Sequence, residues 1–260
     1  MVVLVVFVGL LGLVVGSFLN VVVHRVPAGA SVVSPTSACP NCDVRTRARR
    51  NIPVVGWLLL RGKCSDCGEP ISVRYPLIEL LTGVLFVAVA LRVTEPELPA
   101  YLYFTAMGIA LSVIDLETRR LPNAIVLPSY PIVAVLLTAA AAWQWDFWAL
   151  LRAGIGGVAL FAFFCVLAVS FPAGMGFGDV KLAGIIGIVL GFLSWRALVI
   201  GCFAGFLLGA LAGIAVMVTR KGNRRTALPF GPFMVAGALL AVFTADALTG
   251  ASLRTLGFLS

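Results

Sequence analysis

The sequence VVLVVFVGLLGLVVGSFLNVVV, residues 2–23, contains no charged side chain. A helix needs about 20 apolar residues to cross the hydrocarbon core of a bilayer, and this stretch is long enough. The rest of the chain shares its character, since 61% of the 260 residues are hydrophobic and 12% are charged. Typical soluble domains are about 45–50% apolar and about 25% charged. The composition therefore excludes a water-soluble globule and predicts a protein whose main solvent is lipid.

Seven further apolar stretches follow along the chain. With Val2–Val23, the predicted spans are Leu77–Val93, Ala100–Ile114, Ala124–Trp143, Trp148–Phe171, Val180–Ser194, Ala197–Thr219 and Phe230–Leu248. Glu79 and Arg152 lie near span ends, where long side chains can reach the interface. The predicted fold is all-α: a polytopic transmembrane helix bundle of about eight spans.

Most of the net charge of +8 gathers on one side of these spans. Fifteen of the 19 Lys and Arg residues lie in four connections: eight in His24–Pro76, two in Asp115–Asn123, Lys181 alone, and four in Arg220–Pro229. The connections on the other side, Thr94–Pro99 and Gln144–Phe147, carry only acidic charges. Because basic loops stay in the cytoplasm, we expect these four connections inside and both termini outward.

Two other interpretations of these features are less favoured. The first span could be a signal peptide, but it lacks a basic start, exceeds the usual apolar length and ends in Val23-His24-Arg25 rather than at a small-residue cleavage site. The basic residues could indicate nucleic-acid binding, but they are distributed among loops at one interface, as topology requires. We therefore expect the first span to stay attached and the partner to be the lipid bilayer, without nucleic acid.

The first cytoplasmic connection contains two C-x-x-C pairs, Cys39/Cys42 and Cys64/Cys67. Two such pairs can place four thiolates around one zinc ion in a closed, structural site. Two disulfides are the alternative, but cytoplasmic thiols are kept reduced. The sequence thus predicts a small cytoplasmic zinc-ribbon-like insert whose folding depends on the metal.

Asp115 and Asp179 stand out because charges at span ends are costly and often functional. Asp115 ends the third span, and Asp179 follows Gly174-Met175-Gly176-Phe177-Gly178 at the start of the sixth, on the same side. If brought together, the two carboxyls could share a proton and activate a water, as in aspartic proteases. The structural alternatives are a helix N-cap for Asp179, and an interfacial charge balanced by Arg119 or Arg120 for Asp115.

Ordered motifs along nearly the whole chain resemble those of the type IV prepilin peptidase family. They are Gly16–Pro27, the two cysteine pairs, Asn51–Pro53, Leu60–Cys64, Arg74–Gly83, Ile114-Asp115 with Leu121-Pro122, Gly174–Leu182 and Leu228–Phe233. The resemblance implies a G-x-G-D membrane aspartic protease that removes the leader of type IV prepilins and pseudopilins after a glycine, at the cytoplasmic face of the inner membrane. It implies Asp115 and Asp179 as the catalytic pair and Cys39, Cys42, Cys64 and Cys67 as zinc ligands.

Members with the tetracysteine loop also methylate the new N-terminus with S-adenosylmethionine, so the resemblance implies this second activity. The S-adenosylmethionine-binding residues are unknown from the sequence; Glu79 and Asn51 are guesses. Two positions depart from the family pattern: Gly56 replaces a common serine and Asn123 a common aspartate. Neither belongs to the aspartate pair.

We expect three functional parts: a first span (1–23), a tetracysteine zinc-binding loop (24–76) and a transmembrane protease core (77–260). A rival function is a proton- or cation-coupled transporter that uses the two aspartates, although both lie at one interface rather than at the midplane. Another is a non-enzymatic assembly scaffold organised by the zinc loop.

Overall fold

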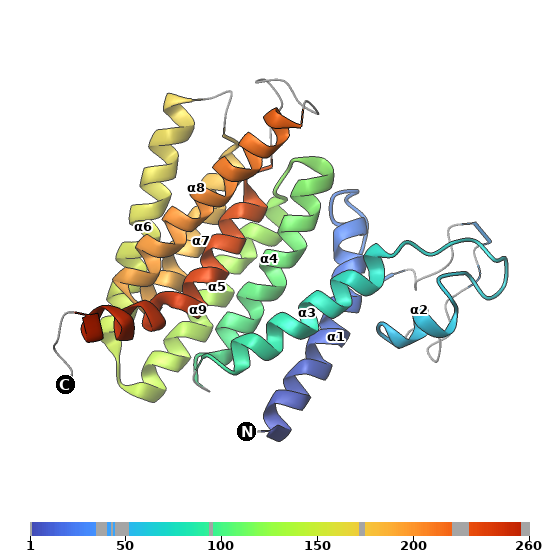
Figure 1. The fold of residues 1–260 in the computed structure, drawn as a ribbon, viewed down its shortest axis with the longest axis horizontal. Coiled ribbons are helices and arrows are strands. Elements are labelled where there is room, and N and C mark those ends of the chain that lie inside the picture. Colours follow the sequence, from blue (N-terminus) through green and yellow to red (C-terminus); the bar gives the residue numbers. More distant parts are fainter. Residues whose placement is uncertain are drawn as a thin grey trace. The chain divides into compact units, whose positions relative to one another are not determined.

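The computed structural model describes residues 2–34, 41–42, 44, 52–93, 96–171, 175–219 and 229–255, with side chains up to residue 244. Within these ranges the regular structure is helical, apart from one antiparallel bridge between Lys63 and Pro70. The chain forms two compact units, Met1–Leu91 and Arg92–Ser260. Figure 1 shows the ribbon of both.

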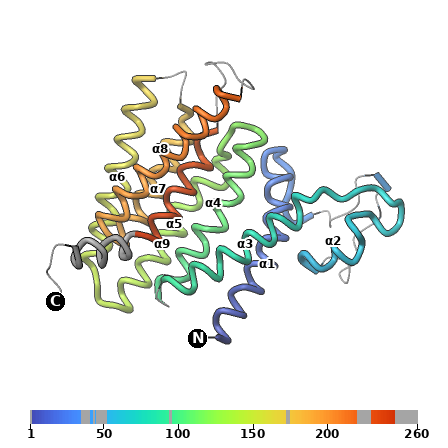
Figure 2. Tube along the Cα trace, in the orientation of Figure 1, coloured from blue at the N-terminus to red at the C-terminus, as the bar shows by residue number. Residues whose placement is uncertain are grey.

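The unit Met1–Leu91 is built on two apolar helices that pack against each other, α1 (Val2–Arg25) and α3 (Arg74–Ala90), with the short α2 (Val55–Leu59) between them in sequence. Figure 2 traces the path of the chain through this unit in blue and cyan. The buried positions of α1 are Val8, Gly12, Gly16, Leu19, Asn20 and Val23. Their spacing of three or four residues places them on one helix face, so α1 turns one stripe toward α3.

The unit Arg92–Ser260 is a bundle of longer helices. They are α4 (Leu98–Thr118), α5 (Asn123–Gln144), α6 (Phe147–Ser170), α7 (Phe177–Leu193), α8 (Trp195–Val218) and α9 (Gly231–Thr255). The most extensive contacts join α6 to α7 and α8 to α9, and α9 also packs on α4. α7 is the most enclosed of these, since most of its residues from Asp179 to Phe192 are buried.

Glycine allows the closest of these contacts. A Cβ atom added to Gly156 of α6 would lie 2.6 Å from the carbonyl oxygen of Gly187 in α7. No side chain fits at that distance, so the two backbones approach as helices do at small-residue interfaces in lipid.

Arg152 of α6 closes the end of α7. Its guanidinium donates to the carbonyl oxygens of Gly191 at 2.6 Å, Phe192, and Leu193 at 3.1 Å. The last carbonyls of a helix lack partners within it, and a cation there also offsets the helix dipole. Arg152, expected near a span end, therefore caps a neighbouring helix.

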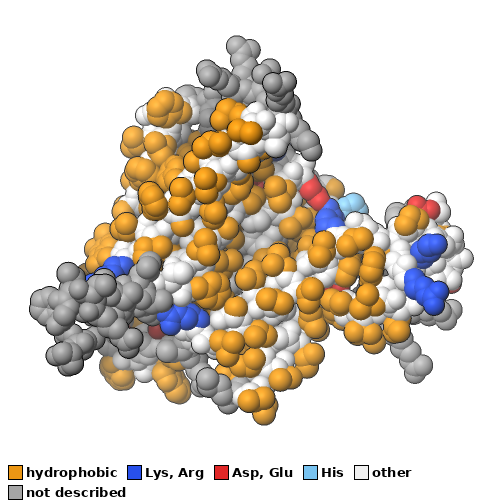
Figure 3. Space-filling view, in the orientation of Figure 1, with side chains coloured by type: hydrophobic (Ala, Val, Ile, Leu, Met, Phe, Trp, Pro, Cys, Tyr) orange, Lys and Arg blue, Asp and Glu red, His pale blue; other side chains and the backbone are white. Residues whose placement is uncertain are grey.

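All eight predicted stretches coincide with helices, with ends that differ by a few residues. Five of them, α1, α4, α5, α6 and α8, are long and apolar enough to cross a membrane. In Figure 3, hydrophobic side chains cover most of the visible face. A chain with that surface and several such helices is a multi-pass membrane protein.

Candidate active site

Asp115 lies in the last turn of α4 and is 5% exposed. The helix ends there because Arg119 takes a left-handed conformation, with φ 54°, and donates its backbone N–H to Asp115 O at 2.8 Å. Arg119 and Arg120 are exposed. The Asp115 side chain instead points toward α9, so the interpretation of Asp115 as an interfacial charge balanced by these arginines is wrong.

Gly231, the first residue of α9, is the partner of that carboxyl. Its backbone N–H donates to Asp115 Oδ2 at 3.0 Å. The first amides of a helix have no acceptor within the helix, and their positive end of the dipole suits a carboxylate. A Cβ atom on Gly231 would lie 2.9 Å from Asp115 Oδ2, so any side chain at residue 231 would displace the carboxyl.

An aromatic cluster holds the residue before Gly231. The ring of Phe230 lies 5.3 Å from that of Phe206 in α8 and 6.2 Å from that of Phe164 in α6, centroid to centroid. Stacked and tilted rings at these distances attract one another beyond their burial. The cluster therefore fixes the entry to α9, and with it the donor that Asp115 uses.

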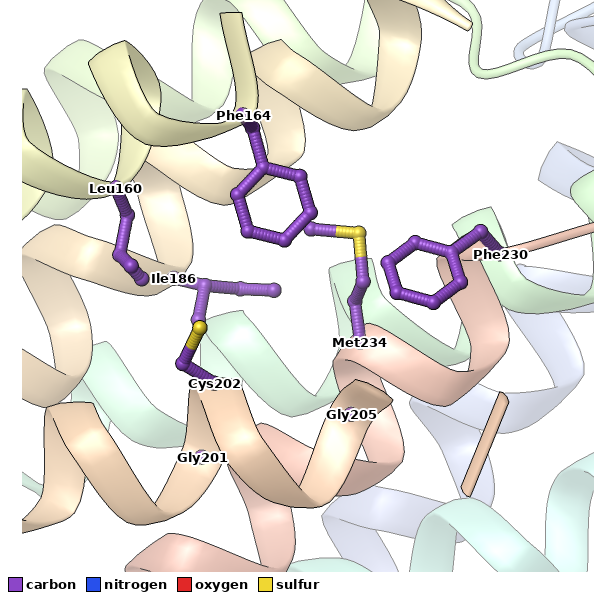
Figure 4. A pocket seen from close by; sticks show the side chains of 8 residues that line it. All are labelled: Leu160, Phe164, Ile186, Gly201, Cys202, Gly205, Phe230 and Met234. Atoms are coloured by element: carbon purple, nitrogen blue, oxygen red, sulfur yellow. The ribbon is translucent and has the colours of Figure 1, made fainter. Parts of the chain in front are cut away.

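A pocket opens beside this cluster, as Figure 4 shows. It is lined by residues of α6, α7, α8 and α9 and by the residue before α9: Leu160, Phe164, Ile186, Gly201, Cys202, Gly205, Phe230 and Met234. Its volume is about 10 Å³, close to what a single water-sized sphere needs. The pocket is a packing gap rather than a ligand site.

Asp179 lies in the first turn of α7 and is 8% exposed. Its Oδ2 accepts the backbone N–H of Gly176 at 3.3 Å. The N-cap of α7 is Gly176, so the interpretation of Asp179 as the N-cap itself is wrong. Asp179 lies three residues after the N-cap, and its carboxyl binds back to the N–H of that residue.

The structure brings the two aspartates into one region of the unit Arg92–Ser260. Both carboxyls are buried, and the residues beside them share one neighbour. Leu121 lies between Gly178, which precedes Asp179, and Gly231, which binds Asp115. A Cβ atom on Gly178 would lie 2.9 Å from Leu121 Cβ, and one on Gly231 would lie 3.5 Å from Leu121 Cδ2. Two buried carboxyls that repel each other can hold a single proton between them, which is the arrangement needed for paired acid and base chemistry.

Lys181 lies two residues after Asp179 on α7. Its Nζ donates to Asn123 Oδ1 at 2.9 Å, and its carbonyl oxygen accepts the Tyr130 hydroxyl at 2.7 Å. Asn123 begins α5, so both bonds join α5 to the start of α7. The departure from the family's aspartate at residue 123 therefore leaves a neutral acceptor for the lysine.

Three of the four predicted zinc ligands gather in the unit Met1–Leu91. The sulphur atoms of Cys42, Cys64 and Cys67 lie within 4.8 Å of one another. Zinc–thiolate bonds of about 2.3 Å in a tetrahedron place sulphurs about 3.8 Å apart, so the three fit one metal ion with little adjustment. Cys39 lies outside the described residues.

Backbone bonds shape the turn that carries Cys64 and Cys67. Cys64 N–H donates to Glu69 O at 2.7 Å, and Gly68 N–H donates to Cys64 O at 3.0 Å. Gly68 has φ 75°, a conformation that glycine adopts without steric penalty. The turn thus points both cysteines to one side.

A buried glutamate of α3 holds the segment before α2. Glu79, 8% exposed, accepts the Val54 backbone N–H through Oε2 at 2.7 Å. Val54 has φ 61°, which is rare for a β-branched residue and costs about 1–3 kcal/mol. The Glu79 side chain is therefore buried against the segment before α2. Asn51, the other guessed position, lies outside the described residues.

The amide of Gly231 and the buried site of Glu79 could not be found from residue type alone. The donor to Asp115 is a backbone group 116 positions away in the chain. The only indication of Gly231 in the sequence was the resemblance of Leu228–Phe233 to a family motif, and that motif assigned no role to the glycine. For Glu79 the signal was a carboxylate within an apolar stretch.

Comparisons with known proteins follow the same division of the chain. The family model described as "Bacterial Peptidase A24 N-terminal domain" matches residues 10–93, and that described as "Type IV leader peptidase family" matches residues 102–214. No solved structure matches significantly.

Curated relatives match over nearly the full length. A protein of Pseudomonas putida is 35% identical over 272 residues, covering 95% of this chain and 93% of its own. One of Bacillus subtilis (strain 168) is 34% identical, covering 91% and 93%, and one of Burkholderia pseudomallei (strain K96243) is 37% identical, covering 90% and 83%. Each is named "Prepilin leader peptidase/N-methyltransferase".

Proposed function

This chain belongs to the type IV leader peptidase family, and we propose that it cleaves the leader from type IV prepilins and pseudopilins and then methylates the new N-terminus. The names of its relatives support both activities. The observation that carries the peptidase assignment is the pair of buried carboxyls, Asp115 and Asp179, brought to one end of the α4–α9 bundle. Nothing in the family match favours the transporter or the scaffold.

In the proposed mechanism Asp115 and Asp179 share one proton. The ionised carboxyl takes a proton from a water that attacks the scissile carbonyl, and the protonated carboxyl donates to the substrate. No covalent intermediate forms. Gly231 N–H holds Asp115 Oδ2 in place, and the substrate reaches the pair as an extended strand beside the glycines of residues 174–178.

We propose that the protein lies in the inner membrane with its active site toward the cytoplasm. Eight spans with both termini outward would place both aspartates at the cytoplasmic ends of their helices, beside the basic connections. The apolar part of a prepilin would pack against the helices while its leader stays in the cytosol. Substrates of this kind belong to pilus assembly or protein secretion.

The three functional parts proposed are the first span (1–23), the cysteine loop (24–76) and the protease core (77–260). Cys39, Cys42, Cys64 and Cys67 would hold a structural zinc ion, which would fix the loop. S-adenosylmethionine would supply the methyl group as an electrophile on sulphur. What supports the metal is the close approach of the three described sulphurs.

Purified protein in detergent, a prepilin peptide and S-adenosylmethionine labelled in its methyl group test both activities. We expect release of the leader, measured by mass spectrometry, followed by label on the shortened peptide. Cleavage at wild-type rate by both Asp115→Asn and Asp179→Asn would contradict the assignment of the pair. Leader release without any label would reduce the protein to a peptidase.

A further inference from the structure

We infer that Glu79 of α3 and Asn20 of α1 form a second site, within the unit Met1–Leu91, that binds an α-ammonium group. The inference rests on the proposed methyl transfer, because the acceptor and the donor of that reaction both carry an α-amino group. No role in the cleavage reaction engages either side chain.

The first support is the charge of Glu79. Of the described residues, Val54 alone donates a hydrogen bond to its carboxylate, at 2.7 Å, whereas a carboxylate offers about four acceptor positions. A neutral side-chain amide could accept the Val54 N–H equally well, without the penalty of burying a charge. The negative charge therefore has a use beyond holding the segment before α2.

The second support is an unpaired oxygen on Asn20, a residue only 3% exposed. Its Nδ2 donates to Gly16 O at 3.3 Å and to Tyr75 O at 3.2 Å. These two bonds fix the orientation of the amide, so Oδ1 faces the other way. Oδ1 is buried and has no hydrogen-bond partner among the described residues. Because most buried polar atoms in native proteins are hydrogen-bonded, this atom calls for a donor from a bound molecule.

The two side chains belong to adjacent turns of the α1–α3 contact. A Cβ atom on Gly16, one turn before Asn20, would lie only 2.7 Å from the Cα atom of Glu79. Tyr75, whose carbonyl accepts from Asn20, is one turn before Glu79 on α3. The two helices run antiparallel here, so Asn20 and Glu79 lie one turn apart along the contact, and each side chain tilts toward the N-terminus of its own helix and thus toward the level of the other.

A carboxylate and an amide oxygen offer acceptors only, and this selects the ligand. An ammonium group brings three N–H donors and a positive charge, so it satisfies the free positions of Glu79 and Asn20 Oδ1 together. Charge-assisted bonds of this kind are about twice as strong as neutral ones. Calcium or magnesium would need six or more oxygen ligands, and these two side chains supply fewer.

Two molecules could bring this group: the processed substrate through its new N-terminus, or S-adenosylmethionine through its methionine moiety. Each is tested by a matched ligand pair in equilibrium binding to the full-length protein in detergent. The first pair is a mature pilin N-terminal peptide with a free or an acetylated amine. The second pair is S-adenosylhomocysteine and 5′-methylthioadenosine, which lacks the amino acid.

We expect the wild-type protein to bind the ammonium-bearing member of one pair about tenfold more tightly. Glu79→Gln keeps an acceptor for Val54 but loses the charge, so it should abolish that preference and leave binding of the other pair unchanged. Asn20→Leu should weaken the preference by a smaller factor. The pair affected identifies which molecule the site holds.

Glu97→Gln is the matched control, since it makes the same change at a glutamate that accepts from Gln144; it should leave the preference intact. Leader cleavage and zinc content report on folding of Glu79→Gln. Equal binding of both members of both pairs by the wild type, or an unchanged preference in Glu79→Gln, would overturn the site. Failure of the wild type to methylate any peptide would instead contradict the proposed function.

Discussion

The two units use buried carboxyls in different ways. In Arg92–Ser260, Asp115 and Asp179 each accept a backbone N–H at a helix start, and both are buried in one region. In Met1–Leu91, Glu79 accepts a backbone N–H before α2 and has an amide, Asn20, as its neighbour across the helix contact. The local support is similar, but among the described residues one unit buries a pair of acids and the other buries a single acid.

A pair of buried acids and a single buried acid suit two different kinds of chemistry. A pair of acids can share a proton, so that one activates water while the other protonates the substrate. A single carboxylate beside a neutral acceptor cannot do both and instead suits a cation. On the proposed function, we expect cleavage to belong to Arg92–Ser260 and Met1–Leu91 to serve the methyl transfer. Changes confined to one unit should therefore spare the activity of the other.

The largest effect is expected for Asp115→Asn. The asparagine oxygen can still accept the Gly231 N–H, so the start of α9 stays in place, but the shared proton is lost. Cleavage of a prepilin peptide should fall by about 10²–10⁴-fold. Methyl transfer to a peptide supplied already cleaved should continue at the wild-type rate, and its loss would show that the two units do not act separately.

Gly231→Ala should come next. Its Cβ atom would lie 2.9 Å from Asp115 Oδ2, so the carboxyl must move, and small displacements of catalytic groups can lower rates by about 10²-fold. The measurement is kcat for leader release. Gly154→Ala on α6 is the control, because a Cβ atom there meets nothing within 4 Å, and it should keep full activity.

The double substitution Cys64→Ser and Cys67→Ser tests the comparison in the unit Met1–Leu91. Loss of two thiolates should remove bound zinc and lower methyl transfer by about tenfold or more, because such loops fold with their metal. Metal analysis and the two activity assays test it, with Cys165→Ala as control. If cleavage fell as far as methyl transfer, the division of labour would be wrong.

The smallest effect is expected for Phe230→Ala, which removes one ring from the cluster that fixes the start of α9. Cleavage should fall by about three- to tenfold as the Gly231 donor becomes less well positioned. Phe163→Ala is matched to it, since Phe163 contacts Phe164 and Phe206 but is 46% exposed. Equal effects of the two changes would count against a positioning role.

The helices could be predicted from the sequence because lipid rewards long apolar runs directly. The stretch Ala124–Trp143, for example, lies within α5, Asn123–Gln144. The orientation of Arg152 and Glu79 could not be predicted, because each binds backbone groups of a distant segment, the end of α7 and the residue before α2. Hydrophobic patterning specifies which face is buried, not which backbone group meets a polar side chain there.

The candidate site divides in the same way. Asp115 and Asp179 could be selected as candidates from their place at span ends and from the glycines before Asp179. The group that binds Asp115 could not be predicted, because every residue type except proline has a backbone N–H. Whether the N–H of Gly231 is used depends on how α9 packs on α4. The three described cysteines were predicted from their spacing, which local turns enforce.

The most direct test of the account is the state of a co-expressed prepilin in cells whose own peptidase gene is deleted and replaced by the Asp179→Asn variant. We predict that the leader stays on the prepilin, while a prepilin supplied already shortened still gains its N-methyl group; mass spectrometry of the pilin N-terminus reads both. Leader removal at the wild-type level in this variant would contradict the central claim that Asp115 and Asp179 form the cleaving pair.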